Sequence, residues 1–240
     1  MKKENHIGCS GYNNGYWKGI FYPEKLARSK WFDYYCEHFN TYEMNGTFYK
    51  FPTESNLLKW YEKAPEGFVF AVKASKIITH IKKFSDCEKE ITDFYTICKN
   101  GLKEKLGAVL FQLPPSFYFS EERLELIINS MLPEFKNVIE FRHETWWNPI
   151  VFEKLSKHNI IFCSVSYPGL PENIVKTSPV GYLRLHGNKK LFYSEYSESE
   201  LNNFHKEFIS TNSFDETFTF FNNTASTAGI NNAVLFKAII

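Results

Sequence analysis

The chain contains 240 residues, with 28 lysines and arginines against 27 aspartates and glutamates. This near-neutral balance argues against a general nucleic-acid or membrane binder, because such proteins depend on an excess of basic charge. The five cysteines form no CxxC pair and no zinc-type spacing, which favours a reduced interior over a disulfide framework. The sequence starts without the apolar segment of a signal peptide, and no apolar run approaches the length of a membrane span. A soluble, cytoplasmic protein without a membrane partner is therefore expected.

Strand-like segments alternate with helix-like segments from one end of the chain to the other. The segments that read as strands are 6–10, 41–45, 68–73, 108–112, 137–141, 160–163, 180–185 and 217–221. Helices are predicted between them, near 26–39, after Thr53, at 85–99, 120–130, 149–158, 197–208 and 225–240. Two capping boxes, Ser85 with Glu88 and Ser197 with Glu200, mark the start of two of these helices.

Eight strands in this alternation predict an α/β fold with a parallel sheet, and the number eight favours a TIM-barrel-like (β/α)8 barrel. No linker rich in glycine, serine or proline divides the sequence, so a single domain spanning 1–240 is expected. A doubly wound open sheet is the structural alternative.

Charged and amide side chains interrupt several otherwise apolar strands near their carboxyl ends. Alternation along a strand places Glu43 and Asn45 on one face, and the same holds for Glu140 with Arg142 and for Arg184 with His186. Functional groups of barrels collect at this end of the strands. The polar residues expected there are Ser10, Glu43, Asn45, Lys73, Gln112, Glu140, Arg142, His143, Ser164, Arg184, His186, Asn222 and Asn223. A buried ring of structural ion pairs is the alternative reading of the charged members.

The loops of the predicted barrel offer two further ligand contacts. The loops after the seventh and eighth strands, at 186–189 and 222–226, contain small and amide residues that would let an anion approach the backbone. Ordinary helix capping explains the same residues equally well. Aromatic residues of the loops, including Trp17 and Tyr49, could stack on a sugar or base, although packing against the rim is the more common role of such rings.

Ordered motifs along nearly the whole chain resemble the YecE-like family, a domain of unknown function. The motifs are the segments 8–12, 17–23, 42–49, 70–73, 79–80, 112–117, 140–143 with Trp146, 183–187, 221–223 and 232–233. The resemblance implies a TIM barrel of variant topology in which one strand, expected to be the last, runs against the others. It also implies an aspartate after the sixth strand, where this sequence has Ser164-Val165-Ser166. It supplies no reaction, cofactor or partner.

The residues predict an enzyme that performs acid–base chemistry, hydrolysis or isomerisation, on a small anionic substrate such as a sugar phosphate or nucleotide. The expected catalytic residues are Glu140, Glu43, His186 and His143. The expected substrate-binding residues are Arg142, Arg184, Lys73, Asn45, Gln112, Asn222, Asn223, Trp17 and Tyr49. No cofactor motif and no metal-binding spacing occurs, so neither a cofactor nor a metal is expected. Two alternatives remain: a non-enzymatic nucleotide or nucleic-acid binding module, and a metal-dependent phosphodiesterase built on Glu43, Glu140 and His186.

Overall fold

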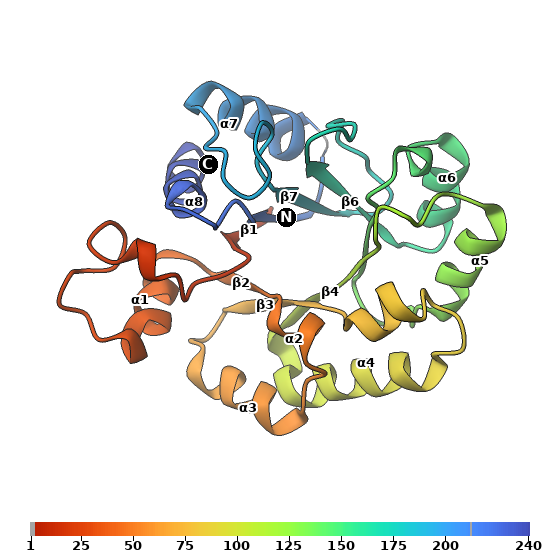
Figure 1. Cartoon of the computed structure of the whole chain (residues 1–240), viewed down its shortest axis with the longest axis horizontal. Coiled ribbons are helices and arrows are strands. Elements are labelled where there is room, and N and C mark those ends of the chain that lie inside the picture. The colour runs from red at the N-terminus through yellow and green to blue at the C-terminus, as the bar shows by residue number, and fades with distance from the viewer. Residues whose placement is uncertain (1–2, 212) are drawn as a thin grey trace. The chain divides into compact units, whose positions relative to one another are not determined.

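The computed structural model describes residues 3–211 and 213–240, and within them eight strands alternate with helices along the chain (Figure 1). The strands are β1 (Glu4–Cys9), β2 (Thr41–Met44), β3 (Val69–Lys73), β4 (Leu106–Gln112), β5 (Asn137–Glu140), β6 (Ile161–Ser166), β7 (Val180–Leu185) and β8 (Glu216–Phe221). They form a sheet in the order β1-β8-β7-β6-β5-β4-β3-β2. The predicted TIM-barrel-like α/β fold is confirmed, because sequential strands are neighbours and the first strand lies beside the last.

Two expectations about strand direction and order are wrong. The last strand is not antiparallel, because β8 pairs in parallel with both β1 and β7. A doubly wound sheet starts in its middle and grows towards both edges. The adjacency of β1 and β8 is incompatible with that order, so the open-sheet alternative is excluded.

Contacts within the chain define two compact units. Unit one comprises the residues up to Glu43, Ser164–Ile174 and the residues from Pro179 onwards. Unit two comprises Met44–Cys163 and Val175–Ser178. The single domain over 1–240 stays a prediction.

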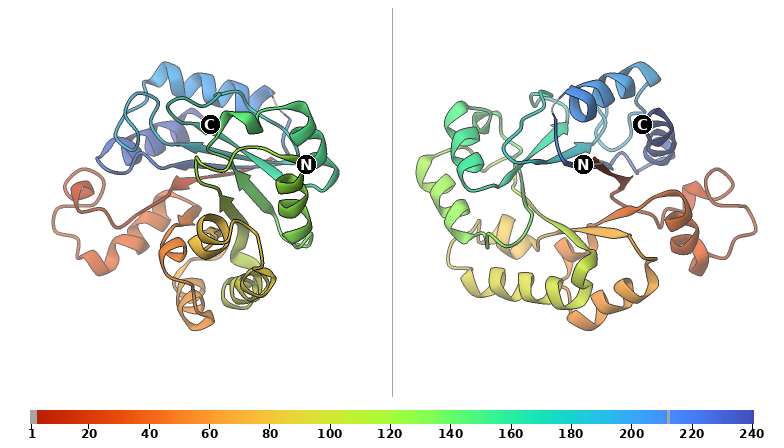
Figure 2. Two further views of the ribbon diagram at one scale, coloured as in Figure 1. Left: turned by 45° about the vertical axis from the view of Figure 1, so that its right-hand side comes forward. Right: turned by 180° about the vertical axis from the view of Figure 1, so that it is seen from behind.

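Unit one contains the first and last strands, with α1 (Trp31–His38), α7 (Glu198–Phe204) and α8 (Ala228–Ile239). Helix α8 packs against β1 and β8, and α7 packs against α8 (Figure 2). From α1, the Tyr35 hydroxyl accepts a hydrogen bond from the Cys9 amide (2.8 Å) and donates one to the Thr41 carbonyl (3.0 Å). A Cβ atom on Gly8 would lie 2.3 Å from that carbonyl oxygen, so only glycine allows this close approach.

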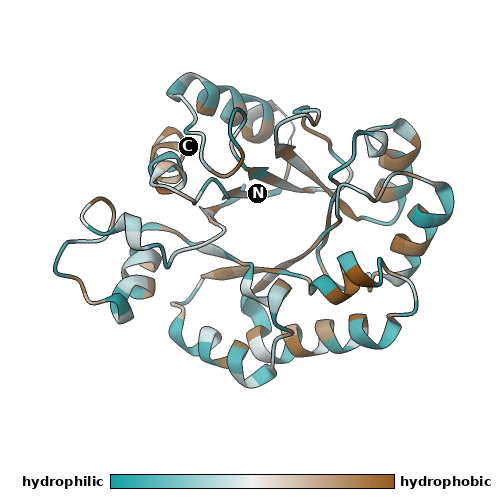
Figure 3. Ribbon diagram, in the orientation of Figure 1, coloured by the Kyte–Doolittle hydropathy of each residue, from teal (hydrophilic) through white to brown (hydrophobic). Residues whose placement is uncertain are grey.

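Unit two contains β3, β4, β5 and the start of β6, with α2 (Gly46–Tyr49), α3 (Glu54–Lys63), α4 (Glu88–Leu102), α5 (Glu121–Ser130) and α6 (Pro149–Lys157). Helices α3 and α4 lie side by side. Hydrophilic and hydrophobic stretches alternate along α4 (Figure 3), as expected for a helix with one buried face. Ile91, Phe94 and Cys98 form part of that face.

The predicted helix starts are confirmed in part. Ser197 and Glu200 form the expected capping box, whereas the box at Ser85 is wrong. Helix α4 begins at Glu88 with Cys87 as its N-cap, because Phe84 and Asp86 adopt positive φ angles in a tight turn before it. Within the described residues, no helix combines the length and apolar character needed to cross a bilayer.

Two elements near the end of β3 lie outside the predicted set. One is the short helix α2, directly after β2. The other is a π-helix at Ile77–Ile81, which follows β3. A second π-helix, His205–Thr211, continues α7 beyond its end. Wider turns of this kind often occur at functional sites.

Candidate functional site

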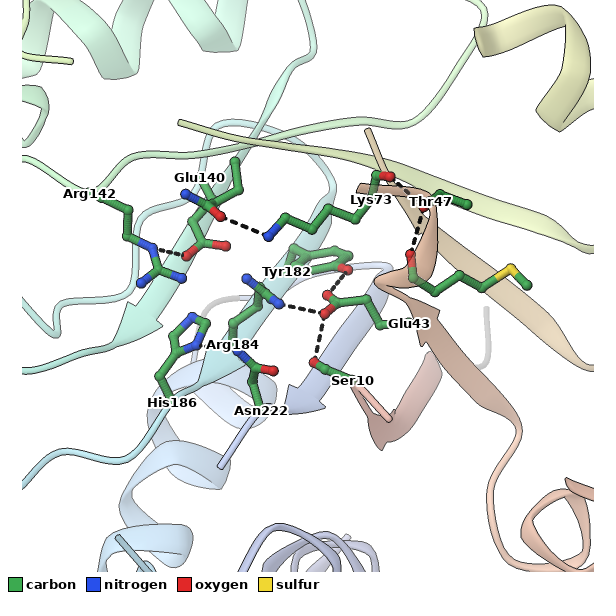
Figure 4. Close-up of polar contacts among 12 residues, drawn as sticks. Ser10, Glu43, Thr47, Lys73, Glu140, Arg142, Tyr182, Arg184, His186 and Asn222 are labelled. Carbon is green, nitrogen blue, oxygen red and sulfur yellow. Dashed lines mark hydrogen bonds and ion pairs between the residues drawn. The ribbon is translucent and has the colours of Figure 1, made fainter. Parts of the chain in front are cut away.

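Polar side chains gather near the carboxyl ends of strands in each unit (Figure 4). In unit one the Glu43 group consists of Ser10, Glu43, Tyr182, Arg184, His186 and Asn222. In unit two the Lys73 group consists of Lys73, His80, Gln112, Glu140 and Arg142. Contacts within its own unit hold each group together. That the two groups share one barrel mouth stays a prediction.

Glu43 is a buried carboxylate that accepts three short hydrogen bonds. Oε1 accepts from Ser10 Oγ and from Arg184 Nη2, each at 2.6 Å, and Oε2 accepts from the Tyr182 hydroxyl at 2.6 Å. Glu43 is 0% and Arg184 1% exposed. A carboxylate engaged by three donors is suited to holding the guanidinium in place. The geometry therefore favours Glu43 as a positioning residue rather than the catalytic residue that the sequence predicts.

His186 and Asn222 join the ends of β7 and β8. Asn222 Nδ2 donates to His186 Nδ1 at 2.8 Å, and the Asn222 amide donates to the Leu185 carbonyl at 2.8 Å. Because Nδ1 accepts this bond, we assign the proton of neutral His186 to Nε2. The His186 side chain is buried, with the Tyr167 ring at its edge (5.6 Å between centroids).

Asn223 links two segments of unit one in this arrangement, and its role in substrate binding stays a prediction. Its side chain is fully buried, and Nδ2 donates to the Ser194 carbonyl (2.8 Å) and to Asn232 Oδ1 (3.1 Å). Asn232 in turn binds both backbone groups of Tyr196. These bonds hold the loop after β7 against α8.

Three members of the Lys73 group, Lys73, Gln112 and Glu140, are the last residues of the consecutive strands β3, β4 and β5. Lys73 Nζ donates to Gln112 Oε1 at 2.8 Å, and Gln112 Nε2 donates to the Leu113 carbonyl at 2.7 Å. Gln112 is paired with Glu140 in the register of β4 and β5. The guanidinium of Arg142 donates through Nε to the fully buried carboxylate of Glu140. Two cations and one carboxylate thus lie at adjacent strand ends.

Helix α2 is fastened to the end of β3 by one hydroxyl. Thr47 Oγ1 lies 2.6 Å from the Lys73 carbonyl oxygen and 3.0 Å from the Met44 carbonyl oxygen, so its single proton serves two acceptors. The ring of the next residue, Phe48, lies under the Lys73 ammonium, 4.1 Å from its centroid. Tyr49 follows Phe48 and is 74% exposed.

His80 is a member of this group that strand periodicity did not identify. It lies on the π-helix after β3, and its Nδ1 is 2.9 Å from Thr79 Oγ1. Partial burial, and then the positive charges of Lys73 and Arg142, lower the pKa of His80 from 6.5 to about 4. His80 is therefore neutral at pH 7. The Thr79-His80 pair among the family motifs is the signal in the sequence that pointed to it.

The remaining predicted residues have other roles or positions. Trp17 is fully buried and donates to the Ser226 carbonyl (3.1 Å), which gives it a packing contact, and its contact with substrate stays a prediction. His143 Nδ1 accepts from the Thr145 amide (3.4 Å) and so caps a short 3-10 helix. Asn45 is the N-cap of α2.

A set of possible metal ligands lies at the opposite, amino ends of strands in unit one. Atoms of Glu4, His6 and Glu216 come within 4.8 Å of one another in the described part of the chain. His6 Nε2 lies 3.1 Å from Glu216 Oε1, and Asn40 Nδ2 faces His6 Nδ1 at 3.4 Å. An amide donor at Nδ1 places the proton on Nε2, so this arrangement is a hydrogen bond joining β1 to β8.

The fold and the polar strand ends define a TIM-barrel-like protein with ionisable groups at the carboxyl ends of its strands. Residues 6–240 match the family described as protein of unknown function DUF72, and the chain belongs to this family. The family membership expected from the motifs is thereby confirmed, while the narrower YecE-like name stays a prediction.

Individual proteins and solved structures are also similar to this chain. The chain is 28% identical over 156 residues to UPF0759 protein YunF of Bacillus subtilis (strain 168), a match that covers 62% of this chain and 54% of YunF. A crystal structure of a DUF72 family protein from Thermotoga maritima MSB8 is 28% identical with a TM-score of 0.89, covering 98% of each chain. A DUF72 family protein from Enterococcus faecalis V583, 19% identical with a TM-score of 0.84, covers 98% of this chain and 94% of its own, and shows the fold alone. This chain thus aligns with about half the length of YunF.

Proposed function

We propose that the protein is an enzyme that binds a small phosphorylated substrate at the Lys73 group and transfers a proton there through Glu140. The observation that carries the proposal is that each cation has an acceptor in place. Lys73 donates to Gln112 on the neighbouring strand, and Arg142 donates to Glu140 at the end of the strand that it follows. These partners orient the ammonium and the guanidinium before a ligand arrives, which reduces the cost of ordering them on binding.

The chemistry follows from the two kinds of group present. Lys73 offers a compact ammonium and Arg142 a planar guanidinium, and both recognise phosphate oxygens. Glu140 offers a carboxylate that can accept a proton from a substrate hydroxyl or from water and return it later in the reaction. The neutral imidazole of His80 adds a hydrogen-bonding group without adding charge.

The Glu43 group enters the proposal as a second set of ligand-binding residues. Arg184 is held by Glu43, and His186 is hydrogen-bonded to Asn222, so each functional side chain has a fixed partner. We propose that the half-buried Asn222 hydrogen-bonds to an anion, while the buried Arg184 supplies positive charge behind it and the buried His186 orients Asn222.

Binding is tested first with inorganic phosphate as the probe, by isothermal titration calorimetry. The Lys73→Met variant should bind phosphate at least tenfold more weakly, whereas Lys76→Met, at an exposed lysine three residues away, should bind as the parent protein does. Equal affinity in the Lys73→Met variant would contradict the proposal.

Turnover is tested on a panel of sugar phosphates and nucleotides followed by ³¹P NMR. The Glu140→Gln variant should lose turnover and still bind phosphate, although more weakly because Arg142 loses the carboxylate that orients it. Glu144→Gln, at an exposed position, should retain both turnover and phosphate affinity. Thermal unfolding of each variant shows whether it folds. A folded Glu140→Gln variant with full turnover would exclude the role of Glu140. Phosphate binding without turnover of any compound in the parent protein would favour the non-enzymatic binding module.

A further inference from the structure

We propose that the phosphorylated ligand of the Lys73 group carries a nucleobase and that Tyr49 is the surface on which the base stacks. This inference rests on the proposed function and narrows its ligand to a mononucleotide. The evidence is the attachment of an exposed aromatic ring, through one short helix, to the strand end that bears Lys73.

The position of Tyr49 relative to the cation follows from two contacts of Phe48. The rings of Phe48 and Tyr49 meet edge to face, with centroids 5.0 Å apart and planes at 88°. The Lys73 ammonium lies 4.1 Å from the Phe48 centroid. One aromatic ring therefore separates the exposed tyrosine from the phosphate-binding cation. A mononucleotide has a matching layout, because one pentose separates its phosphate from its base.

Helix α2 holds Tyr49 in this position. The Thr47 hydroxyl binds the carbonyl oxygen of Lys73 itself, and the Lys50 amide binds the Gly46 carbonyl at 3.2 Å, which closes the helical turn. Tyr49 is nevertheless 74% exposed, more than the other large apolar or aromatic side chains found exposed in the described residues. An exposed ring on a helix that is anchored to the strand end of Lys73 is a stacking surface that costs little entropy to use.

The surroundings favour a base over a bare sugar phosphate. On the side of α2, the Lys73 ammonium faces the ring of Phe48. The His80 ring also contacts Phe48, with centroids 4.9 Å apart and planes at 81°. Hydroxyl groups of a sugar need hydrogen-bonding partners, whereas a base gains from stacking on an aromatic ring. Stacking of this kind is worth about 1–3 kcal/mol per base, which corresponds to roughly fivefold to 150-fold in affinity.

The test compares three probes by isothermal titration calorimetry: adenosine 5′-monophosphate, ribose 5-phosphate and inorganic phosphate. The parent protein should bind the nucleotide at least fivefold more tightly than ribose 5-phosphate. Tyr49→Ala should remove this advantage without changing the affinity for ribose 5-phosphate, and Tyr49→Phe should keep it. Tyr16→Ala, at a tyrosine that is 70% exposed on another element, should leave all three affinities unchanged.

The outcomes separate this inference from the proposed function. Equal binding of the nucleotide and ribose 5-phosphate, each weakened by Lys73→Met, would overturn the inference and leave the phosphate site intact. No binding of any probe to the parent protein would overturn both. Nucleotide binding that depends on Tyr49 but not on Lys73 would overturn the phosphate site, and with it the mononucleotide arrangement. Tighter binding of a single-stranded oligonucleotide than of the mononucleotide would replace the proposed ligand class with a nucleic acid.

Discussion

Glu43 and Arg184 form a buried ion pair in which Glu43 Oε1 lies 2.6 Å from Arg184 Nη2. The Glu43 side chain is 0% exposed and the Arg184 side chain 1%. Removing one partner of such a pair leaves an uncompensated buried charge. Glu43→Gln and Arg184→Met should each lower the free energy of unfolding by about 3–5 kcal/mol. Denaturant unfolding measures these changes, with Glu37→Gln at an exposed site of α1 as the control.

The double variant distinguishes a structural pair from two independent residues. Since the second substitution removes the charge that the first left unpaired, the double variant should be clearly more stable than the sum of the single losses implies. Simple additivity would contradict the pairing.

His80 should report the charge of the Lys73 group. Burial is the main cause that lowers the pKa of His80 to about 4, and the charge of Lys73 adds to it, so Lys73→Met should raise that pKa part of the way towards 6.5. Titration of the His80 ring protons by NMR measures both values. A pKa that does not move would show that Lys73 exerts no field on the imidazole.

The same shift has a consequence for stability. The folded pKa of His80 lies below its ordinary value, so the unfolded chain binds the proton more readily. The contribution of neutral His80 to stability is complete above pH 6.5 and is lost as the pH falls towards 4. His80→Gln should therefore flatten the decline of the unfolding free energy within this window, whereas an unchanged slope would contradict the assignment.

Thr47 should control the attachment of α2. Thr47→Val keeps the size of the side chain but leaves the Lys73 carbonyl without this donor, so a loss of about 1–3 kcal/mol in unfolding free energy is expected. Thr47→Ser retains the hydroxyl and should therefore keep most of the unfolding free energy of the parent protein. Nucleotide affinity should fall together with stability in the valine variant, because Tyr49 depends on α2 for its position.

The strands were predictable because each is a short apolar run that helix-like segments separate from the next. Residues 180–185 were predicted with the bounds that the structure has, and the other strands differ at their ends. The direction of β8 was misjudged because direction is decided by pairing with β1 and β7, which a local pattern does not contain. The expectation came from the family resemblance alone.

Residues of the candidate site could be predicted only where the alternation of side chains along a strand indicates them. Glu140 and Arg142 were found by their spacing, and the structure pairs them. The burial of Trp17 and Asn223 could not be foreseen because it depends on distant contacts, with Ser226 and Ser194 respectively. His80 was missed because its ring reaches the group from a π-helix, which has neither the period of a strand nor that of an α-helix.

The adjacency of β1 and β8 has a consequence for the order in which the chain folds. Unit one is assembled from segments at both extremes of the sequence, whereas nearly all of unit two is the uninterrupted stretch Met44–Cys163. Contacts between distant segments require a large loop to close and therefore form late. During synthesis the central stretch can fold while β8 is still inside the ribosome. The edge of β1 that pairs with β8 stays unpaired until β8 emerges.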